Sequence, residues 1–423
     1  MLRNLSKRYS NSSFSISKNL IPASWMRAST SGVNSAHPKR ALGYQTILDQ
    51  PLMWLVLSLC FLGLIMVYSA TIALPESTKY SSYAPTHFLS RHAFSLLVAF
   101  VAGFMVFRVP SYQWQKLAPL AFLVCIGLLI LVLIPGVGKE VNGARRWLSL
   151  PFITIQPSEL MKICAILYAS DYAVRKLGYM QHMAKVLLPM ILAMFLVGTL
   201  LLLEPDMGAF IVIVMLVFGI LFLAGVNAKF FVVLLLGLGT AFTVLIAFSD
   251  YRRARLMAFL DPWSDSNSLD KAYQLSHSLI AFGRGEFFGV GLGGSVEKLH
   301  YLPEAHTDFI LAVIGEELGF IGVTVVILMF LWVVQRCFKI GQQAIGLERI
   351  FQGLVAKGVG IWIAFQCLIN MGVNLGLLPT KGLTLPLMSY GGSAILVCGI
   401  GIALVFRVDY ENRSLMAGHG GIR

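Results

Sequence analysis

The sequence predicts an all-α polytopic membrane protein, a bundle of about ten transmembrane helices with one large extracytoplasmic loop. Of its 423 residues, 57% are hydrophobic and only 13% are charged, whereas a soluble domain carries about 25% charged residues. The apolar residues stand in long blocks, and a helix needs about 20 of them to cross a bilayer. Because backbone amides cannot stay unpaired in hydrocarbon and these blocks do not alternate, we expect helices, not a β-barrel.

Ten blocks are long enough to be candidate spans. The least apolar of them, at 158–174, is marginal because it contains Glu159, Lys162 and Asp171. The predicted spans are 51–74, 88–107, 117–135, 158–174, 186–203, 207–226, 229–248, 308–335, 353–377 and 386–406.

The distribution of charge predicts the orientation of the bundle. Residues 1–48 carry seven Lys and Arg side chains and no acid, which predicts a disordered cytoplasmic tail, with an organelle transit peptide as the alternative. With that tail inside, the cytoplasmic segments hold 20 Lys+Arg and 5 Asp+Glu, and the outer segments hold 13 and 15. The sums of +15 and −2 follow the positive-inside rule, so the net charge of +13 reports topology and no nucleic-acid partner is expected.

This orientation places both termini in the cytoplasm of a multi-pass plasma-membrane protein. The predicted parts are a tail at 1–48, a membrane domain at 49–408 with its large outer loop at 249–307, and a C-terminal tail at 409–423. The six cysteines fall in or at the ends of apolar blocks and form no CxxC pair, so neither a structural disulfide nor a cysteine metal site is expected.

The outer segment 136–157 carries cations on the side where positive charge is disfavoured. Arg145 and Arg146 are predicted to bind an anion, because a guanidinium offers a bidentate fork to phosphate. Trp147 is a candidate stacking surface for a sugar. The alternative is interfacial anchoring, with an ion pair to Glu140.

Polar residues also mark the start of the fourth span and the turn before the sixth. Ser158 is predicted to cap the fourth helix. Glu159 and Lys162 are either a structural pair or part of a site wall, since ionisable groups within a span usually face a cavity. Asp206 is expected to cap the next helix, or to line the same site.

The loop 249–307 and the start of the eighth span hold the densest polar chemistry. Residues 271–282 predict an amphipathic interfacial helix that includes Gln274. A GxGxxG match at 289–294 is discounted, because no βαβ unit surrounds it. His306 and Asp308 follow, and either Thr307 or Asp308 is expected to open the eighth span. Gln274 and His306 are candidate substrate-binding residues.

Two more acids lie one to two turns into that span, and two further candidates lie near the last span. Glu316 lies on a different part of the helix from Glu317, which is expected to pair with another helix. Before the last span, Lys381 is a further outer cation and Ser389 a further polar candidate.

These motifs, in this order and on this side, resemble the SEDS family of cell-wall proteins over residues 45–412. The similar segments look closer to the cell-division branch of that family than to its elongation branch. They are GARRW at 143–147, QPSE with Lys162, EPDMG at 204–208, AFGRGE at 281–286, LPEAHTDFI at 302–310, EELG at 316–319, PTKGLTLPLMSYGGS at 379–393 and RVDYE at 407–411.

The resemblance implies a peptidoglycan glycosyltransferase that polymerises lipid II at the outer face of the plasma membrane during septal cell-wall synthesis. It implies Asp308 as the catalytic residue, and a penicillin-binding transpeptidase and other division proteins as partners. One carboxylate suffices as general base for an inverting transfer, because diphosphate is a good leaving group that needs positive charge more than an acid.

This mechanism assigns Arg146 and Lys381 to the diphosphate and places Glu159, Lys162 and Asp206 around the pocket. A divalent cation, Mg or Mn, bridging the diphosphate is left open, since no clean ligand set is visible. Two other functions stay open at this point. A lipid II flippase would use the charges within the spans, and a non-enzymatic division scaffold would not need Asp308.

Overall fold

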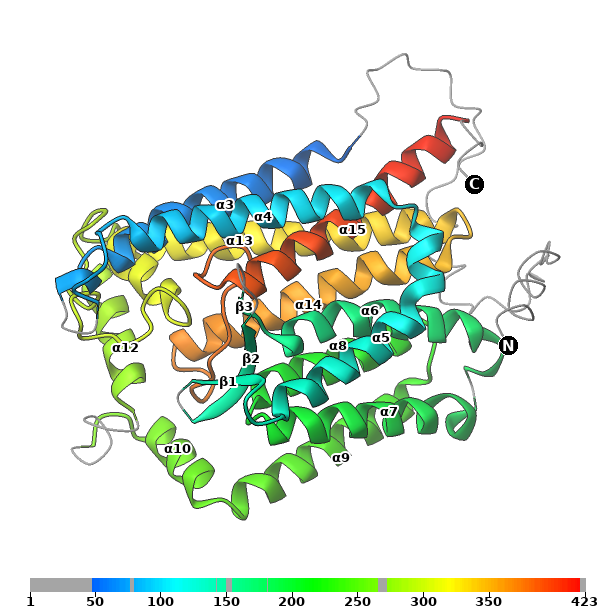
Figure 1. The fold of residues 1–423 in the computed structure, drawn as a ribbon, viewed down its shortest axis with the longest axis horizontal. Coiled ribbons are helices and arrows are strands. Elements are labelled where there is room, and N and C mark those ends of the chain that lie inside the picture. Colours follow the sequence, from blue (N-terminus) through cyan, green and yellow to red (C-terminus); the bar gives the residue numbers. More distant parts are fainter. Residues whose placement is uncertain are drawn as a thin grey trace.

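A computed structural model describes residues 48–76, 80–141, 143–149, 154–180, 182–264 and 272–418. The predicted tail at 1–48 therefore lies, except for its last residue, outside the described part of the chain. Figure 1 shows the long helices running side by side. Their bounds are α3 Gln50–Thr71, α4 His87–Arg108, α5 Ser111–Leu133, α6 Pro157–Arg175, α7 Met183–Leu203, α8 Met207–Leu223, α9 Ala228–Ala247, α13 Ile310–Gly346, α14 Ile350–Asn374 and α15 Gly392–Met416.

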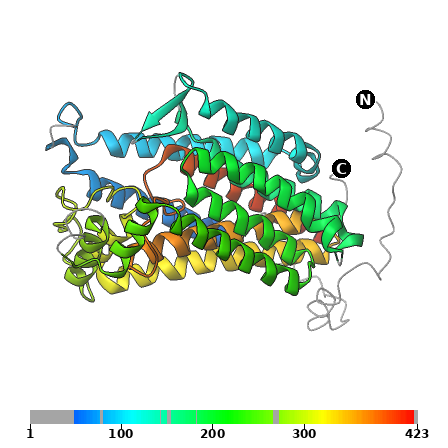
Figure 2. The same cartoon turned by 90° about the horizontal axis from the view of Figure 1, so that it is seen from below.

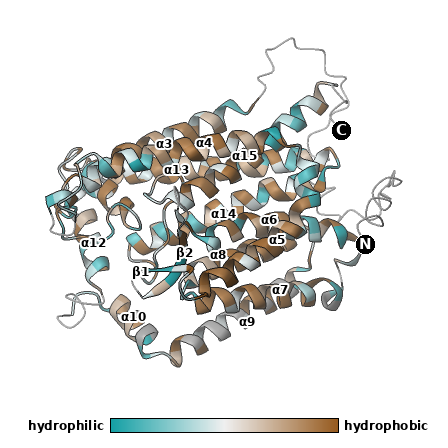
Figure 3. Cartoon of the chain, viewed as in Figure 1, coloured by the Kyte–Doolittle hydropathy of each residue, from teal (hydrophilic) through white to brown (hydrophobic). Residues whose placement is uncertain are grey.

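Each of the ten predicted spans coincides with one of these helices, which confirms the helical membrane fold. Within the described residues, seven helices are long and apolar enough to cross a bilayer, and α8 is a shorter apolar helix. Figure 3 shows hydrophobic residues along the helix bodies and hydrophilic residues at both ends of the bundle. This banding is typical of helices surrounded by hydrocarbon in the middle and by water at their ends.

The bundle is organised around α14 and α15. In each, 72% of the most apolar 18-residue window is buried, against 22% for α4, so α14 and α15 are central and α4 faces outward. The long helix α13 packs along α14, and α4 packs along α15. Figure 2 shows the same parallel arrangement from below, with the connecting loops gathered at the two ends.

Three predicted boundaries need correction. The last span begins at Gly392, later than the predicted 386, because residues 376–391 form a non-helical connection. It also continues to Met416, with Asp409 and Glu411 buried, beyond the boundary at 408 drawn from the sequence. Asp308 lies in turns just before α13 and not within the helix, which starts at Ile310.

The outer segment 136–157 contains a small β-sheet that the sequence analysis did not predict. Its strands β1 Gly138–Val141, β2 Ala144–Ser149 and β3 Thr154–Ile155 form a three-stranded antiparallel sheet in the order β1-β2-β3. The sheet packs on the ends of α5 and α6. The register of β1 with β2 shifts between Lys139 and Glu140, so the pairing is irregular opposite Arg146.

Two further helices shape the loop 249–307: α10 Asp250–Leu260 and α12 Tyr273–Gly285. The predicted amphipathic helix at 271–282 is thus close to α12, which buries Leu275 and Ser278. Figure 1 places α10, α12 and the sheet at one end of the bundle. At the other end, the Asp49 backbone N–H before α3 donates to Asp409 Oδ2 of α15 at 2.8 Å, as an even number of crossings requires.

Candidate functional site

Asp308 lies where connections between the helices meet at one end of the bundle. Its backbone carbonyl accepts hydrogen bonds from two side chains of α14, Asn370 Nδ2 at 2.8 Å and Asn374 Nδ2 at 2.9 Å. A hydrogen bond from the Ala312 backbone N–H to Asn374 Oδ1 at 3.2 Å fixes the first turn of α13 to the same helix. The backbone at Asp308 is therefore held firmly against the centre of the bundle.

The Asp308 carboxylate itself is half-buried, and no group of the described residues donates a hydrogen bond to it. Burial raises its pKa to about 7, the negative charge of Glu304 adds to the rise, and the Arg146 guanidinium opposes it. A carboxyl group with a pKa near neutrality is poised to accept a proton at physiological pH.

The connection between α14 and α15 brings Lys381 to this carboxylate. Gly382 approaches so closely that a Cβ on it would lie 2.7 Å from Asp308 Oδ2. The neighbouring Lys381 Nζ lies 3.4 Å from the sulfur of Met207, the first residue of α8. The connection thus places Gly382 against the Asp308 carboxylate and the neighbouring Lys381 at the start of α8.

The two arginines that were predicted as a pair have different partners. The pairing of β2 with β1 is irregular here, because Arg146 falls between Arg145, which pairs with Glu140, and Trp147, which pairs with Lys139. Arg145 Nε pairs with Glu140 Oε2 at 3.1 Å, with both side chains partly exposed. Arg146 instead reaches the turn after α7, where its Nε donates to the Glu204 carbonyl at 2.9 Å and its Nη2 to the Pro205 carbonyl at 2.6 Å.

Arg146 thus belongs to the Asp308 site, and Arg145 forms the ion pair considered as the alternative. Trp147 is half-buried and pairs with Lys139 of β1.

Asp206 confirms its predicted role as a helix cap. Its Oδ1 accepts from the Ala209 backbone N–H at 3.1 Å, at the start of α8. Its Oδ2 accepts from Ser158 Oγ at 2.8 Å and Gln156 Nε2 at 3.1 Å. The prediction of Ser158 as the cap of α6 was wrong, because Gln156 occupies that position and Ser158 turns toward Asp206.

Glu204 adds a second buried carboxyl group beside Asp206. Neither of its carboxylate oxygens has a hydrogen-bond partner in the described structure. Burial raises the pKa of Glu204 to about 8, and the charge of Asp206 adds to the rise. Glu204 is therefore a weaker acid than a solvent-exposed glutamate.

Glu159 and Lys162 form a buried ion pair, with Lys162 Nζ 2.7 Å from Glu159 Oε1. Lys162 is fully buried and also donates to Gln366 Oε1 of α14 at 2.9 Å. The Gln366 amide nitrogen donates in turn to the Thr384 carbonyl at 2.9 Å. The pair thus lies beneath the site and supports the connection that carries Lys381.

The remaining predicted site residues lie at the margins. His306 is half-buried, and its ring packs against Phe88 and Tyr390 with centroids 5.6 and 5.5 Å apart. Ser389 is buried within its own connection, where its Oγ accepts from the Leu385 backbone N–H at 2.8 Å. Gln274 is half-buried on α12, and no hydrogen bond among the described residues joins it to the Asp308 site.

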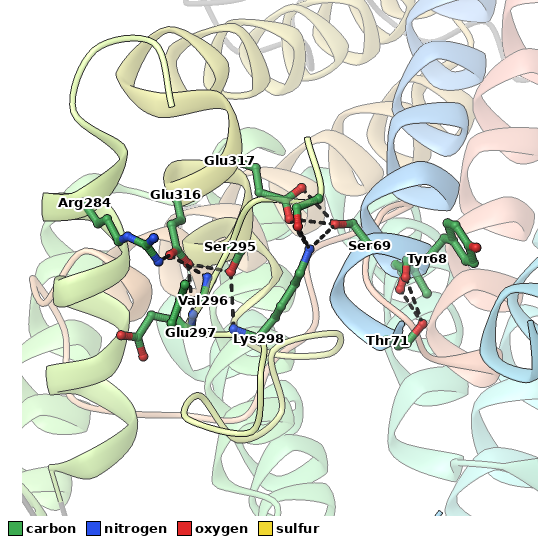
Figure 4. Close-up of polar contacts among 12 residues, drawn as sticks. Tyr68, Ser69, Thr71, Arg284, Ser295, Val296, Glu297, Lys298, Glu316 and Glu317 are labelled. Atoms are coloured by element: carbon green, nitrogen blue, oxygen red, sulfur yellow. Dashed lines mark hydrogen bonds and ion pairs between the residues drawn. The ribbon is translucent and has the colours of Figure 1, made fainter. Parts of the chain in front are cut away.

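Glu316 and Glu317 form a separate polar cluster, shown in Figure 4. Glu316 is fully buried and accepts from Arg284 Nη1 at 2.9 Å, from Ser295 Oγ at 2.5 Å and from the backbone N–H of Val296 at 2.8 Å. Together these contacts bind α12 and the loop after it to the start of α13.

Glu317 is bound from the other side of α13. It accepts from Lys298 Nζ at 2.7 Å and from Ser69 Oγ of α3 at 2.7 Å, which confirms that Glu317 pairs with another helix. We call these contacts of Glu316 and Glu317 the loop clamp. Close by, Gly319 has φ 65° and ψ −165° and interrupts α13, and the Glu316 carbonyl accepts from the Val290 backbone N–H of the loop at 2.9 Å.

The sequence analysis missed a column of amides on α14. Gln366, Asn370 and Asn374 recur every four residues, which places them on one face of the helix, and all are buried. Three amides at this spacing in an otherwise apolar span were visible as a signal. The prediction of the site used charged residues and not amides, although uncharged amides in a membrane span also need hydrogen-bond partners.

The fold and the site define a multi-span membrane protein with a polar centre built from the connections at one end of its bundle. A sequence model of the FtsW/RodA/SpoVE group, described as cell cycle protein, matches residues 50–414. The chain belongs to this family.

Two relatives carry the name probable peptidoglycan glycosyltransferase FtsW. The protein from Burkholderia thailandensis is 59% identical over 94% of this chain and 86% of its own length. The protein from Polynucleobacter necessarius is 55% identical over 93% of this chain and 92% of its own length.

Two solved structures share the fold. A chain from a structure titled as a peptidoglycan synthase complex that coordinates polymerisation and crosslinking has a TM-score of 0.70 and 27% identity, over 86% of this chain and 98% of its own. The rod shape determining protein RodA of Thermus thermophilus has a TM-score of 0.62 and 27% identity, over 86% of this chain and 97% of its own length.

Proposed function

We propose that this chain is an inverting peptidoglycan glycosyltransferase, which polymerises lipid II into glycan strands at the outer face of the bacterial inner membrane. The observation that carries the proposal is the placement of Asp308. Its half-buried carboxylate has no hydrogen-bond donor among the residues that the structure describes, and it lies beside the Lys381 connection. The names of the relatives from Burkholderia thailandensis and Polynucleobacter necessarius support the reaction class.

In this mechanism Asp308 is the general base. Its carboxylate takes the proton from the acceptor sugar hydroxyl while that oxygen attacks the anomeric carbon of the donor. The bond from the anomeric carbon to the diphosphate breaks, and polyprenyl diphosphate leaves with the electron pair. Because one displacement occurs, the α-linked donor becomes a β-linked product.

The cations of the site suit the departing diphosphate. Arg146 influences the pKa of Asp308 by its charge, and Lys381 precedes the glycine that touches the Asp308 carboxylate. Fixed positive charge stabilises the negative charge that develops on the leaving oxygen. Glu159, Lys162 and Asp206 then act by holding the segments that carry these groups.

A divalent cation bridging the diphosphate stays a prediction. Within the described residues, no group of three or more His, Cys, Asp or Glu side chains could hold a metal ion. Any such ion would therefore depend on the substrate phosphates for part of its coordination.

The charges inside the spans favour polymerisation over lipid transport. A flippase needs polar groups along a path between the leaflets, and Lys162, Glu316 and Glu317 were the residues suggesting one. All three are buried and paired with other side chains, so they serve the structure of the bundle.

The proposal includes its cellular setting. The chain is expected at the division septum with both termini in the cytoplasm, as its charge asymmetry predicts. A penicillin-binding transpeptidase is the expected partner, because a lone polymerase makes linear glycan that must be crosslinked. The synthase complex matched in structure supports this association.

The test is polymer formation from purified lipid II by the full-length chain, alone and co-purified with its transpeptidase, with and without Mg²⁺ or Mn²⁺. The wild-type chain is expected to produce glycan polymer. Movement of lipid II between the leaflets of liposomes without polymer would favour the flippase and refute the proposal.

A further inference from the structure

The amide of Asn370 on α14 contacts both segments that carry the proposed chemistry. Asn370 is 1% exposed, in a helix whose length and apolarity suit a membrane span. An amide in such a place must find hydrogen-bond partners within the protein, because hydrocarbon offers none. Its partners therefore reveal what the residue does.

Both hydrogens of the Asn370 amide nitrogen are used. Nδ2 donates to the Asp308 carbonyl at 2.8 Å and to the Leu383 carbonyl at 2.6 Å. An asparagine NH₂ group has two donors, so its donor capacity is filled by these two carbonyls. One carbonyl belongs to the turn before α13, and the other to the connection that contains Lys381.

The acceptor side of the same amide supports this assignment. Asn370 Oδ1 is buried without a hydrogen-bond partner in the described part of the chain. A buried polar atom left unpaired is destabilising. The amide of Asn370 therefore acts through its two donors and not through its oxygen.

The two segments joined by Asn370 touch each other directly above it. Gly382 precedes Leu383, and a Cβ at Gly382 would lie 2.7 Å from Asp308 Oδ2. The Asp308 carboxylate and the Lys381 connection therefore meet with almost no clearance. A small shift of either carbonyl changes how the carboxylate and the Lys381 side chain face a common substrate.

We infer that Asn370 is a positioning residue, whose two hydrogen bonds hold the Asp308 turn and the Lys381 connection in the relative placement that sugar transfer requires. The inference rests on the proposed function. Asn370 does not touch the reacting atoms and acts through the backbone of the two segments. Its loss should therefore reduce the rate of the chemical step more than the binding of lipid II.

The experiment measures kcat and KM for lipid II polymerisation by the full-length chain co-purified with its transpeptidase. Asn370→Ala is expected to lower kcat about 10- to 100-fold, the range that small misplacements of reacting groups produce, with KM changed less than about threefold. Asn370→Asp keeps the size of the side chain and replaces the amide donors with a carboxyl group, so it should show the same loss.

Asn412→Ala is the matched control. Asn412 is also a fully buried asparagine whose Nδ2 donates to a backbone carbonyl, that of Ile340 at 3.1 Å, but at the opposite end of the bundle. The control separates the general cost of losing a buried amide from the effect on the site. It should lower the unfolding temperature as Asn370→Ala does, and leave kcat per folded molecule unchanged.

Gly382→Ala tests the same placement without removing a buried hydrogen bond. The added methyl group must displace the Asp308 carboxylate, so kcat should fall while the unfolding temperature stays near that of the wild type. This variant keeps the inference testable if the Asn370 variants do not fold.

The outcomes are distinct. An Asn370→Ala chain with the kcat of Asn412→Ala overturns the inference alone, as does a normal kcat for Gly382→Ala. A wild-type complex that forms no polymer overturns the proposed function, and the inference with it.

Discussion

Asp308 and the loop clamp of Glu316 and Glu317 lie close together in the sequence, yet the bundle treats their carboxylates in opposite ways. Glu316 accepts from two side chains and two backbone amides, and Glu317 from Ser69 and Lys298. The Asp308 carboxylate has no donor within the described structure, although two amides hold its backbone.

This difference separates structural from reactive acids in the same region. Hydrogen bonds from several donors stabilise the charged form of a carboxylate. Such a carboxylate holds together the segments that carry the donors. The Asp308 carboxylate is half-buried and has no donor among the described residues. Burial raises its pKa to about 7, so it can accept a proton. Burial of an acid near the membrane boundary is common to both regions, and the supply of donors distinguishes them.

The largest expected effect concerns Asp308, the proposed general base. Asp308→Asn should lower the rate of lipid II polymerisation by about 10²- to 10⁴-fold, the usual contribution of a general base. The unfolding temperature should stay the same, because the carboxylate has no donor to lose. Polymer length and amount on gels measure the rate, and normal polymerisation would remove Asp308 from the mechanism.

The next effect tests the loop clamp. Lys298→Met leaves Glu317 buried without its cation and should lower the free energy of unfolding by about 3–5 kcal/mol. Chemical unfolding in detergent measures the loss. The double variant Lys298→Met/Glu317→Leu removes both charges and should recover much of the stability. A single variant as stable as the wild type would show that the clamp is not structural.

A smaller effect separates the two arginines of β2. Arg146→Ala should lower kcat about 10²-fold, as the loss of one fixed transition-state contact does. Arg145→Ala is the matched control and should change little, because its partly exposed ion pair with Glu140 is worth roughly 0–1 kcal/mol. Equal losses for both variants would contradict the division of roles that the sheet imposes.

The smallest effect concerns pH. Asp308 acts as a base only when deprotonated, so the rate should rise with pH, reach half its maximum near pH 7 and level off above about pH 8. Glu304→Gln removes a negative neighbour, lowers the pKa of Asp308 and should move this rise to lower pH. Initial polymerisation rates between pH 5 and pH 9 check both expectations (the interval brackets the pKa of about 7). If the rate rises at the same pH in Glu304→Gln as in the wild type, the titrating group is not Asp308.

Much of the site was predictable because membrane helices restrict where polar residues can stand. Lys381 and Arg146 were predicted from their charge and their predicted side, Asp308 as the catalytic residue from the family resemblance, and the helical capping by Asp206 from its place after Pro205. The small sheet was not predicted, because its strands are short and their residues read equally well as a loop. The roles of Arg145 and Arg146 depended on that sheet, since Arg145 pairs with Glu140 of β1 whereas Arg146, at an irregularity of the pairing, reaches the turn after α7.

The sequence by itself determined the membrane class, the ten helices and the family of this protein, because hydrophobic blocks and ordered motifs are local properties of the chain. Only the tertiary structure decided which acids are paired. Glu317 finds Ser69 from α3, and the Asp308 carbonyl finds Asn370 from α14. These partners are far away along the chain. Packing of the helices brings donors to the Glu317 carboxylate, and it brings none of the described donors to the Asp308 carboxylate.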